Sequence, residues 1–182
     1  MAGSQEKGLP WRLSEDDRDI TSSLQEEISE EDRRAREKAL SLLLAQERSA
    51  RDLQNRLCRS GFSEKAAGQA VSYVQQLGYL DDQRFACNYV RFRKGKKSRR
   101  ELQMKLSEKG VDRELISLAL EEYTKEEEIE ALLIQLQKRL KGRNFREMDL
   151  GERQKLKAAV ARKGYPVNLI QTAISTLEQG EE

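Results

Sequence analysis

One dense basic run in the middle of the 182-residue chain carries the side chains best suited to a binding role. Between residues 91 and 100, seven of the ten side chains are cationic and none is acidic. These seven are Arg91, Arg93, Lys94, Lys96, Lys97, Arg99 and Arg100. Such a run attracts polyanions, because phosphates or surface carboxylates offset its mutual repulsion. The run therefore predicts a site for DNA or for an acidic protein surface; the alternative is a solvated basic loop.

The run spans the end of one expected helix, a loop and the start of the next helix. Cations stabilise the C-terminus of a helix but oppose the partial positive charge at an N-terminus. The stability of the local helices therefore does not explain Arg99 and Arg100, whereas a bound polyanion does. The spacing of Phe92 fits the apolar edge of the first helix, so we expect it in the core rather than stacked on a base. Ser98 and Glu101 have the spacing of a capping box.

Catalytic chemistry has few candidate residues in this sequence. The chain has no histidine, the commonest general base near neutral pH and the commonest metal ligand. Its two cysteines, Cys58 and Cys87, are too few for a structural zinc site and are typical of reduced thiols in a cytosolic protein. Adjacent acids such as Asp81 and Asp82 point about 100° apart on a helix and share no site. We therefore expect no catalytic residue, no metal and no cofactor.

Composition favours helices and argues against a membrane-spanning class. Charged residues make up 36% of the chain, hydrophobic residues 37% and aromatic residues 5%, with only two prolines. Leu, Ala, Glu, Lys, Arg and Gln dominate, and these residues are good helix formers. No stretch approaches the roughly 18 apolar residues of a spanning helix, and no secretory signal pattern is seen. We expect an all-α, cytoplasmic protein.

The charges are divided unevenly along the chain. Residues 1–32 carry 3 basic and 10 acidic side chains, whereas residues 33–182 carry 31 basic and 22 acidic ones. Few apolar side chains accompany the acids near the N-terminus, so too little surface can be buried to offset the entropy of ordering. We expect residues 1–30 to form an acidic, disordered tail that folds over the basic body and competes with DNA.

An internal repeat organises the rest of the chain. Three glycines that end short helices, Gly61, Gly110 and Gly164, lie 49 and 54 residues apart. On this register three sets of apolar residues coincide, namely Leu53, Leu102 and Leu156, then Leu57, Leu106 and Val160, then Ala70, Ala119 and Ala173. Each unit reads as helix, short helix and helix, and is too small for a large core, so neighbouring units should stack.

The predicted fold is therefore all-α, an elongated and curved tandem array of three three-helix repeats rather than a compact globule of nine helices. The repeats are expected at residues 31–78, 79–123 and 124–182, and a loop is expected at residues 142–151. We expect the array to be a monomer.

One junction between the predicted repeats has a distinctive sequence, which comprises Gly78, Tyr79, Leu80, Asp81, Asp82, Arg84 and Phe85. Gly78 can end a helix with a positive φ angle. Asp81 can cap the next helix by accepting backbone N–H bonds, and Asp82 suits the positive end of the dipole of that helix. We interpret this block as structural rather than as an active site.

The same block makes the chain resemble a known family. The string GYLDDQRFA at residues 78–86, followed by the short helix at 101–108 and by Lys109-Gly110-Val111, resembles the RecX family of bacterial recombinase regulators. The resemblance covers residues 35–123 well, and residues 124–182 in helix pattern and register only. One departure is Lys96-Lys97-Ser98, where the family often has a glycine-rich turn; another is Glu152, which stands where Ser98 stands in the second repeat.

The resemblance implies a protein without enzymatic activity that binds the RecA recombinase and its filament on single-stranded DNA. It further implies that the protein lies in the helical groove of the filament and hinders ATP hydrolysis, growth and strand exchange. We expect a recombination regulator whose basic run engages filament DNA or recombinase, with weak direct binding to DNA. The alternatives are a helical-repeat adaptor that binds only protein, and a small regulator that reads duplex DNA with one short helix.

Overall fold

The computed structural model describes residues 29–179, and these fold into helices joined by short turns. The first unit contains α2 (Glu30–Ala45), α3 (Ala50–Arg59) and α4 (Glu64–Gln76). The second contains α5 (Asp82–Arg91), the 3-10 turn η1 (Lys94–Lys96), α6 (Arg99–Glu108) and α7 (Arg113–Glu121). The third contains α8 (Lys125–Leu140), the 3-10 turn η2 (Phe145–Glu147), α9 (Leu150–Ala161) and α10 (Val167–Gln179).

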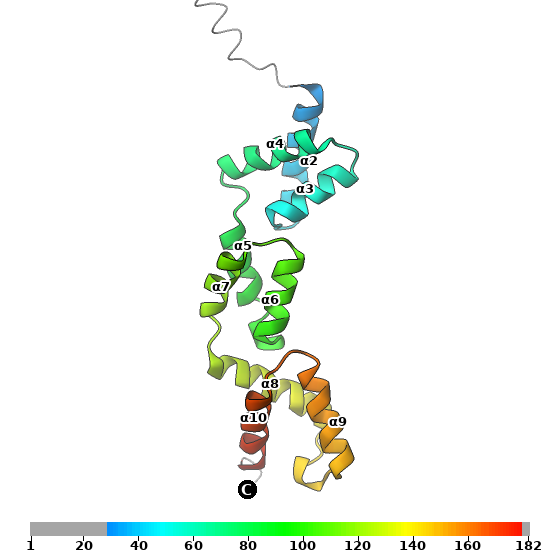
Figure 1. Cartoon of the computed structure of the whole chain (residues 1–182), viewed down its shortest axis with the longest axis vertical. Helices are drawn as coiled ribbons and strands as arrows, with labels where there is room; N and C mark the ends of the chain where they lie inside the picture. The colour runs from blue at the N-terminus through cyan, green and yellow to red at the C-terminus, as the bar shows by residue number, and fades with distance from the viewer. Residues whose placement is uncertain (1–28, 180–182) are drawn as a thin grey trace, which may run out of the picture.

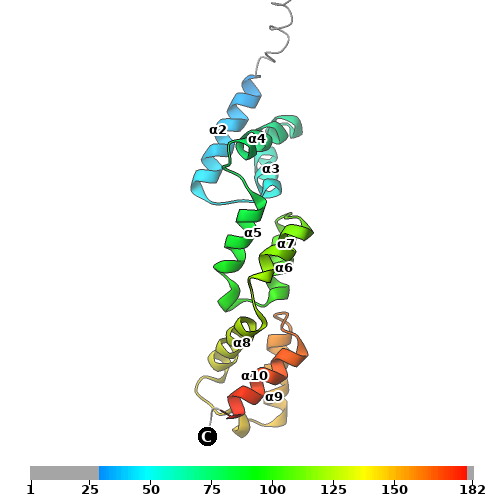
Figure 2. The ribbon, with the colours of Figure 1, turned by 90° about the vertical axis from the view of Figure 1, so that its left-hand side faces the viewer.

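The three units follow one another along the long axis of the molecule (Figure 1). A view turned by 90° shows the same end-to-end order (Figure 2). The prediction of an elongated, all-α tandem array is therefore confirmed for residues 29–179. The expected acidic tail lies outside the described residues except for its last two, Ser29 and Glu30, which begin α2. No helix between residues 29 and 179 combines the length and apolar character that crossing a membrane requires.

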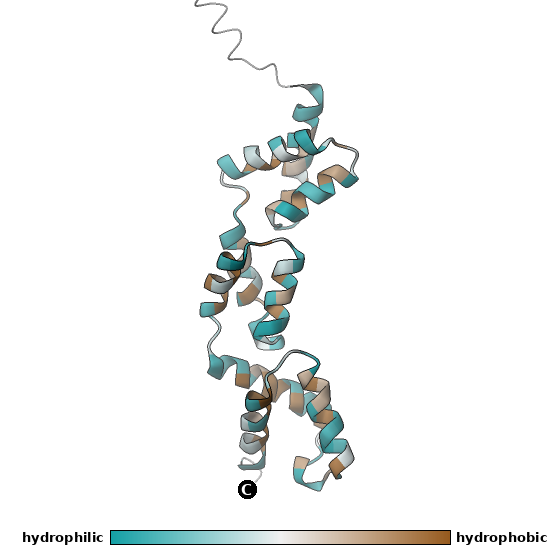
Figure 3. Ribbon diagram, viewed as in Figure 1, coloured by the Kyte–Doolittle hydropathy of each residue, from teal (hydrophilic) through white to brown (hydrophobic). Residues whose placement is uncertain are grey.

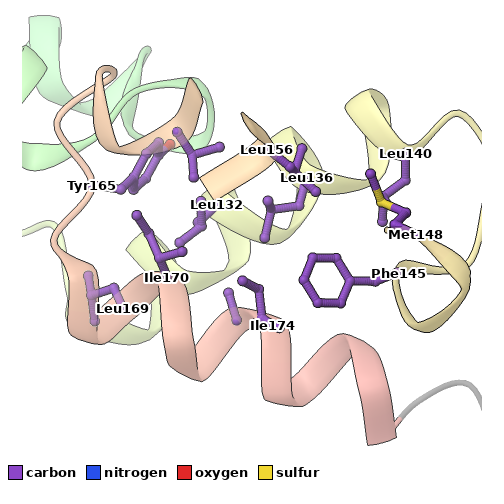
Figure 4. Packing of buried hydrophobic residues seen from close by; sticks show 12 residues of the cluster. Leu132, Leu136, Leu140, Phe145, Met148, Leu156, Tyr165, Leu169, Ile170 and Ile174 are labelled. Carbon is purple, nitrogen blue, oxygen red and sulfur yellow. The ribbon is translucent and has the colours of Figure 1, made fainter. Parts of the chain in front are cut away.

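Each unit encloses a small apolar core of its own. The apolar residues placed in register by the repeat are buried in all three units, with Leu53, Leu102 and Val160 fully shielded from solvent. In the third unit, side chains from α8, α9, α10 and η2 converge, and Phe145 and Ile174 point into the space between them (Figure 4). Apolar residues accordingly gather along the inner faces of the helices (Figure 3).

The starts of the helices are fixed by short polar side chains. A serine, threonine or aspartate caps each of α2 to α9 by accepting an N–H bond from the first turn. The expected capping box of Ser98 and Glu101 is only half formed, because the Glu101 carboxylate pairs with Lys97 instead. The expected loop at 142–151 is shorter than predicted, because Asp149 accepts the Glu152 N–H at 2.7 Å and starts α9 at Leu150.

Candidate nucleic-acid interface

The middle helices α3, α6 and α9 are joined head to tail by serine hydroxyls. The Ser49 Oγ at the start of α3 donates to the carbonyl oxygen of Lys109, at the end of α6, at 2.5 Å. In the same way, the Ser98 Oγ donates to the carbonyl oxygen of Lys163, just beyond the end of α9, at 2.7 Å. The positive end of one helix dipole thus meets the negative end of the next, which is a favourable arrangement. This contact sets the spacing of the units.

A carboxylate provides a second tie at each junction. The Asp82 Oδ1 accepts the N–H of Ala50 in α3 at 2.8 Å, and the Glu128 Oε1 accepts the N–H of Arg99 in α6 at 2.8 Å. The Asp82 carboxylate therefore accepts a hydrogen bond at the N-terminus of α3 in the preceding unit. The sequence had suggested instead that it interacts with the dipole of its own helix, α5. Burial raises the pKa of the Asp82 carboxyl, although the bond from Ala50 acts in the opposite direction.

The rest of the distinctive block holds the link between α4 and α5. Gly78 has a φ of 73°, and Asp81 accepts the Arg84 N–H at 2.9 Å. The Arg84 guanidinium donates to the carbonyl oxygens of Gly78 and Tyr79, both at 3.2 Å. Leu80 and Phe85 are buried, whereas the Tyr79 ring is exposed. The block thus organises one junction of the array.

Two repeat glycines sit where one unit touches the next. A Cβ on Gly110 would lie 2.6 Å from the Cβ of Arg51, and a Cβ on Gly164 would lie 2.8 Å from the Oγ of Ser98. At Gly61, in the first of the described units, a Cβ would have no neighbour within 4 Å among the described residues. Glycine at 110 and 164 therefore permits close contact as well as a positive φ angle.

Three cations of the basic run have carboxylate partners, one of them across the junction between the second and third units. Lys94 pairs with Glu127 of α8 at 2.5 Å, and this ammonium holds the pKa of the Glu127 carboxyl below its usual range. Lys97 pairs with Glu101, and Arg91 reaches Glu122 at 3.5 Å in an exposed pair. An exposed pair of this kind contributes little to stability. The Lys94 and Lys97 ammonium groups thus have structural partners.

Arg99 also has a structural role that the sequence did not indicate. Its guanidinium donates to the carbonyl oxygen of Tyr123, while the Tyr123 hydroxyl donates to the carbonyl oxygen of Lys97 at 3.0 Å. The expectation that local structure does not explain Arg99 is therefore wrong. These two hydrogen bonds join the start of α6 to the segment between α7 and α8. That segment is more than 20 residues from Arg99 in the sequence, so the contact could not be predicted from local spacing.

Three cations of the run have neither a carboxylate partner nor a side-chain hydrogen bond within the part of the chain that the structure describes. They are Arg93, Lys96 and Arg100. The Arg93 guanidinium lies over the ring of Tyr89, 3.9 Å from its centroid. Arg100 is exposed and lines a hollow of about 500 Å³ between α6 and the end of α9. These are the side chains of the run that can meet a phosphate without first breaking an ion pair.

Phe92 is not in the core, contrary to the prediction. Its side chain is 74% exposed, because α5 ends at Arg91 and the chain turns towards η1 just after it. Phe92 continues the row formed by Phe85 and Tyr89 on one face of α5, but it extends beyond the apolar core. The exposed ring lines a hollow together with Arg93 and Lys109.

The structure adds basic residues that the sequence analysis missed. Arg162 and Lys163 line the hollow beside Arg100, and Lys109 lines a second hollow beside Phe92. A signal for two of them exists in the sequence, because Lys109 and Lys163 each directly precede a repeat glycine. Within residues 29–179, no three His, Cys, Asp or Glu side chains gather as a metal site would require.

Comparisons with known proteins identify relatives of this chain. Models of the second and third three-helix domains of RecX match residues 81–120 and 126–174. A regulatory protein RecX from Mycobacterium leprae is 31% identical over 140 residues, which cover 76% of this chain and 82% of that protein. A regulatory protein RecX from Caldanaerobacter subterraneus subsp. tengcongensis is 31% identical over 147 residues, which cover 80% and 71% respectively.

Solved structures share the same fold. The crystal structure of RecX from Lactobacillus salivarius matches with a TM-score of 0.71 at 22% identity, over 82% of this chain and 97% of that chain. A second crystal structure, of a regulatory protein RecX, matches with a TM-score of 0.69 at 21% identity, over 88% and 79%. The resemblance seen in the sequence is thus confirmed over most of the chain's length. This chain belongs to the RecX family of regulatory proteins.

Proposed function

We propose that this protein binds a RecA-type recombinase filament on single-stranded DNA and inhibits filament growth, ATP hydrolysis and strand exchange. The observation that carries the proposal is the continuous column of three units, in a RecX family member, with unpaired cations on its middle unit. An elongated body suits a helical groove, and cations suit the phosphates inside it. The protein acts in the cytoplasm by binding and catalyses no reaction itself.

The contacts divide into two kinds within the basic run. Arg93, Lys96 and Arg100 face the filament, where they meet DNA phosphates or acidic recombinase side chains. Lys94 joins the second unit to the third through Glu127, whereas Lys97 and Arg99 hold the second unit together through Glu101 and the Tyr123 carbonyl. The outer units then bridge neighbouring recombinase protomers, so that these cannot turn over or exchange strands.

Single-stranded-DNA-dependent ATP hydrolysis by a RecA-type recombinase, titrated with this protein, tests the proposal. Inhibition well below one molecule per recombinase protomer supports capping of filament ends. Inhibition that appears only near saturation supports coating of the groove. If the folded protein inhibits at no ratio, the proposal fails and an adaptor that binds another protein takes its place.

A charge-removal variant tests the role of the cations. We expect replacement of Arg93, Lys96 and Arg100 by glutamine to weaken inhibition and to flatten its salt dependence, because fewer counterions are released. A matched control replaces Arg34, Lys38 and Lys65, three exposed cations of the first unit, by glutamine. Lys97 and Arg99 are left intact, because changing them would disturb the packing of the second unit and confuse a folding defect with a binding defect.

Salt dependence separates this proposal from its two rivals. A protein that contacts phosphates loses affinity steeply as salt rises, whereas an adaptor with an apolar contact does not. A duplex-reading regulator would show a preference among duplex sequences. In the short helix α6, Arg99 binds the Tyr123 carbonyl and Lys105 pairs with Glu108, so few of its side chains are free to read bases and we place that rival last.

A further inference from the structure

A small hollow between the first and second units has an unusual lining. Its volume is about 230 Å³, and it lies between α5 and the chain segment that follows α2. Three aromatic rings from one face of α5 and its C-cap, Phe85, Tyr89 and Phe92, form one side. Phe85 is buried beneath, whereas the Phe92 ring at the rim is 74% exposed. An exposed ring at the mouth of a hollow offers a face for another flat ring.

Two cations are fixed at the walls of this hollow. The Arg93 guanidinium lies 3.9 Å from the centroid of the Tyr89 ring. The Lys109 Nζ lies 6.0 Å from the ring centroids of both Phe85 and Tyr89. Neither cation has a carboxylate within 4.0 Å among residues 29–179. Because the Lys109 carbonyl is bonded to Ser49, the junction itself holds Lys109 at this place.

One acidic side chain defines what can enter the hollow. Glu47 lines it together with Asn88, whose amide donates to the Glu47 carboxylate at 3.2 and 3.3 Å, and the same carboxylate lies 3.9 Å from the Arg84 guanidinium in an exposed ion pair. This negative charge opposes a phosphate inside the hollow, but it accepts a hydrogen bond from an amino group. The lining therefore suits a flat ring with an exocyclic amino group, with phosphates placed outside near the cations.

We infer that this hollow binds one base of a single-stranded nucleic acid, stacked on Phe92, with the exocyclic amino group of that base donating to Glu47. The flanking backbone phosphates contact Arg93 and Lys109. A base within a duplex is already stacked and paired, so an unpaired strand is the form that fits. The inference deepens the proposed function by naming the ligand of this face, but it can be tested without a recombinase.

Binding of dye-labelled 15-nucleotide strands to the full chain, followed by fluorescence anisotropy, tests the inference. We expect an oligo-dC strand to bind more tightly than an oligo-dT strand, because thymine lacks an exocyclic amino group. Phe92→Ala should weaken oligo-dC binding roughly 5- to 100-fold, as expected for the loss of one stacked base. Phe92→Trp should retain binding. Val167→Ala, which shortens a 67% exposed side chain in the third unit, should leave binding unchanged.

A second readout reports stacking directly. A strand that contains 2-aminopurine should lose fluorescence when its base stacks on Phe92, and Phe92→Ala should restore that fluorescence. Unchanged oligo-dC affinity of Phe92→Ala would overturn the inference, and so would equal affinities of the wild-type chain for oligo-dC and oligo-dT.

The outcomes also separate this inference from the proposed function. If Phe92→Ala keeps its affinity for strands but loses inhibition of a recombinase, then the hollow receives a protein side chain and the inference fails. If Phe92→Ala loses affinity for strands while the wild-type chain inhibits no recombinase, then the inference stands and the proposed function fails.

Discussion

The hydroxyl oxygen of Ser98 lies 2.7 Å from the carbonyl oxygen of Lys163, 65 positions further along the chain. The same oxygen accepts the Glu101 N–H at 3.1 Å, so one side chain both caps α6 and joins it to the end of α9. Ser49 repeats this arrangement with Lys109 and the Asp52 N–H. Local capping and assembly of the array therefore depend on the same two hydroxyls.

Ser98→Ala should lower the free energy of unfolding by about 2–3 kcal/mol, about 1 for the cap and the remainder for the unpaired Lys163 carbonyl. The control is Ser29→Ala, because Ser29 caps α2 through the Asp32 N–H at 3.0 Å in an exposed position. That variant should lose only about 1 kcal/mol. Urea denaturation followed by circular dichroism measures both values, and equal losses would contradict the tie between units.

Alanine at the three repeat glycines should have unequal effects. All three have positive φ angles, 94°, 77° and 89° for Gly61, Gly110 and Gly164. Gly61→Ala should cost about 1–2 kcal/mol from backbone strain alone. Gly110→Ala should cost a further 1–3 kcal/mol or so, because its Cβ would overlap the Arg51 stem. Thermal denaturation of the variants checks this order, and a Gly61→Ala that is the least stable would contradict it.

Ionisation of Asp82 should lower the free energy of unfolding as pH rises. Burial raises the pKa of its carboxyl in the folded state, so the folded chain holds this proton more tightly than the unfolded chain does. Its contribution is therefore fully present below the unfolded pKa of about 3.9 and is lost as pH rises through the higher folded pKa. Asp82→Asn keeps an oxygen to accept the Ala50 N–H but does not titrate.

The measurement is the difference in free energy of unfolding between Asp82→Asn and the wild-type chain, taken from pH 3.5 to pH 7. We expect this difference to shift in favour of the variant as pH rises. Asp82→Ala, which loses the bond from Ala50 as well, should be less stable than Asp82→Asn throughout. A difference that does not change with pH would disprove the raised pKa.

Two buried tyrosines should respond in opposite ways to loss of the hydroxyl. The Tyr123 hydroxyl donates to the Lys97 carbonyl at 3.0 Å, so Tyr123→Phe should cost about 1–2 kcal/mol. The Tyr165 hydroxyl is buried and finds no hydrogen-bond partner among residues 29–179, and burial raises its pKa to about 12. Tyr165→Phe should therefore be neutral or stabilising. Chemical denaturation of both variants measures the change in the free energy of unfolding. A larger decrease for Tyr165→Phe than for Tyr123→Phe would contradict the prediction.

Removal of residues 1–28 should raise affinity for single-stranded DNA at low salt, because seven acidic and only three basic side chains are removed. The cut leaves Ser29, which caps α2, and Glu31, whose carboxylate accepts the Ser63 N–H at 2.7 Å. Anisotropy titrations of the full and shortened chains give the comparison. Equal affinities at low salt would show that the acidic segment does not compete with DNA.

The sequence was sufficient to predict the repeat and several helix starts, but not the start of α9 at Leu150. Gly61, Gly110 and Gly164 set a register, and the apolar residues in that register proved to be buried, because helical periodicity and glycine stops are local properties. The cap at Asp81 was predicted correctly for the same reason, since it forms within a single turn.

Contacts between units could not be predicted in this way. The Asp82 carboxylate accepts the N–H of Ala50 in α3, and the Glu128 carboxylate accepts the N–H of Arg99 in α6; both contacts depend on how two units are docked. Phe92 has the spacing of a core residue, but the helix that would bury it ends one residue earlier. Spacing alone therefore could not distinguish a buried ring from an exposed one.

The cap of α9 differs in chemistry from the caps of α3 and α6. At the two inner junctions a serine hydroxyl donates to the carbonyl of the following unit, whereas Asp149 caps α9 with a carboxylate, which when ionised only accepts. A fourth unit, or the first unit of another copy, would set its carbonyl oxygen against that carboxylate. Asp149 therefore lacks the donor hydrogen by which Ser49 and Ser98 join neighbouring units, so the exposed start of α9 offers no equivalent contact to an incoming carbonyl oxygen.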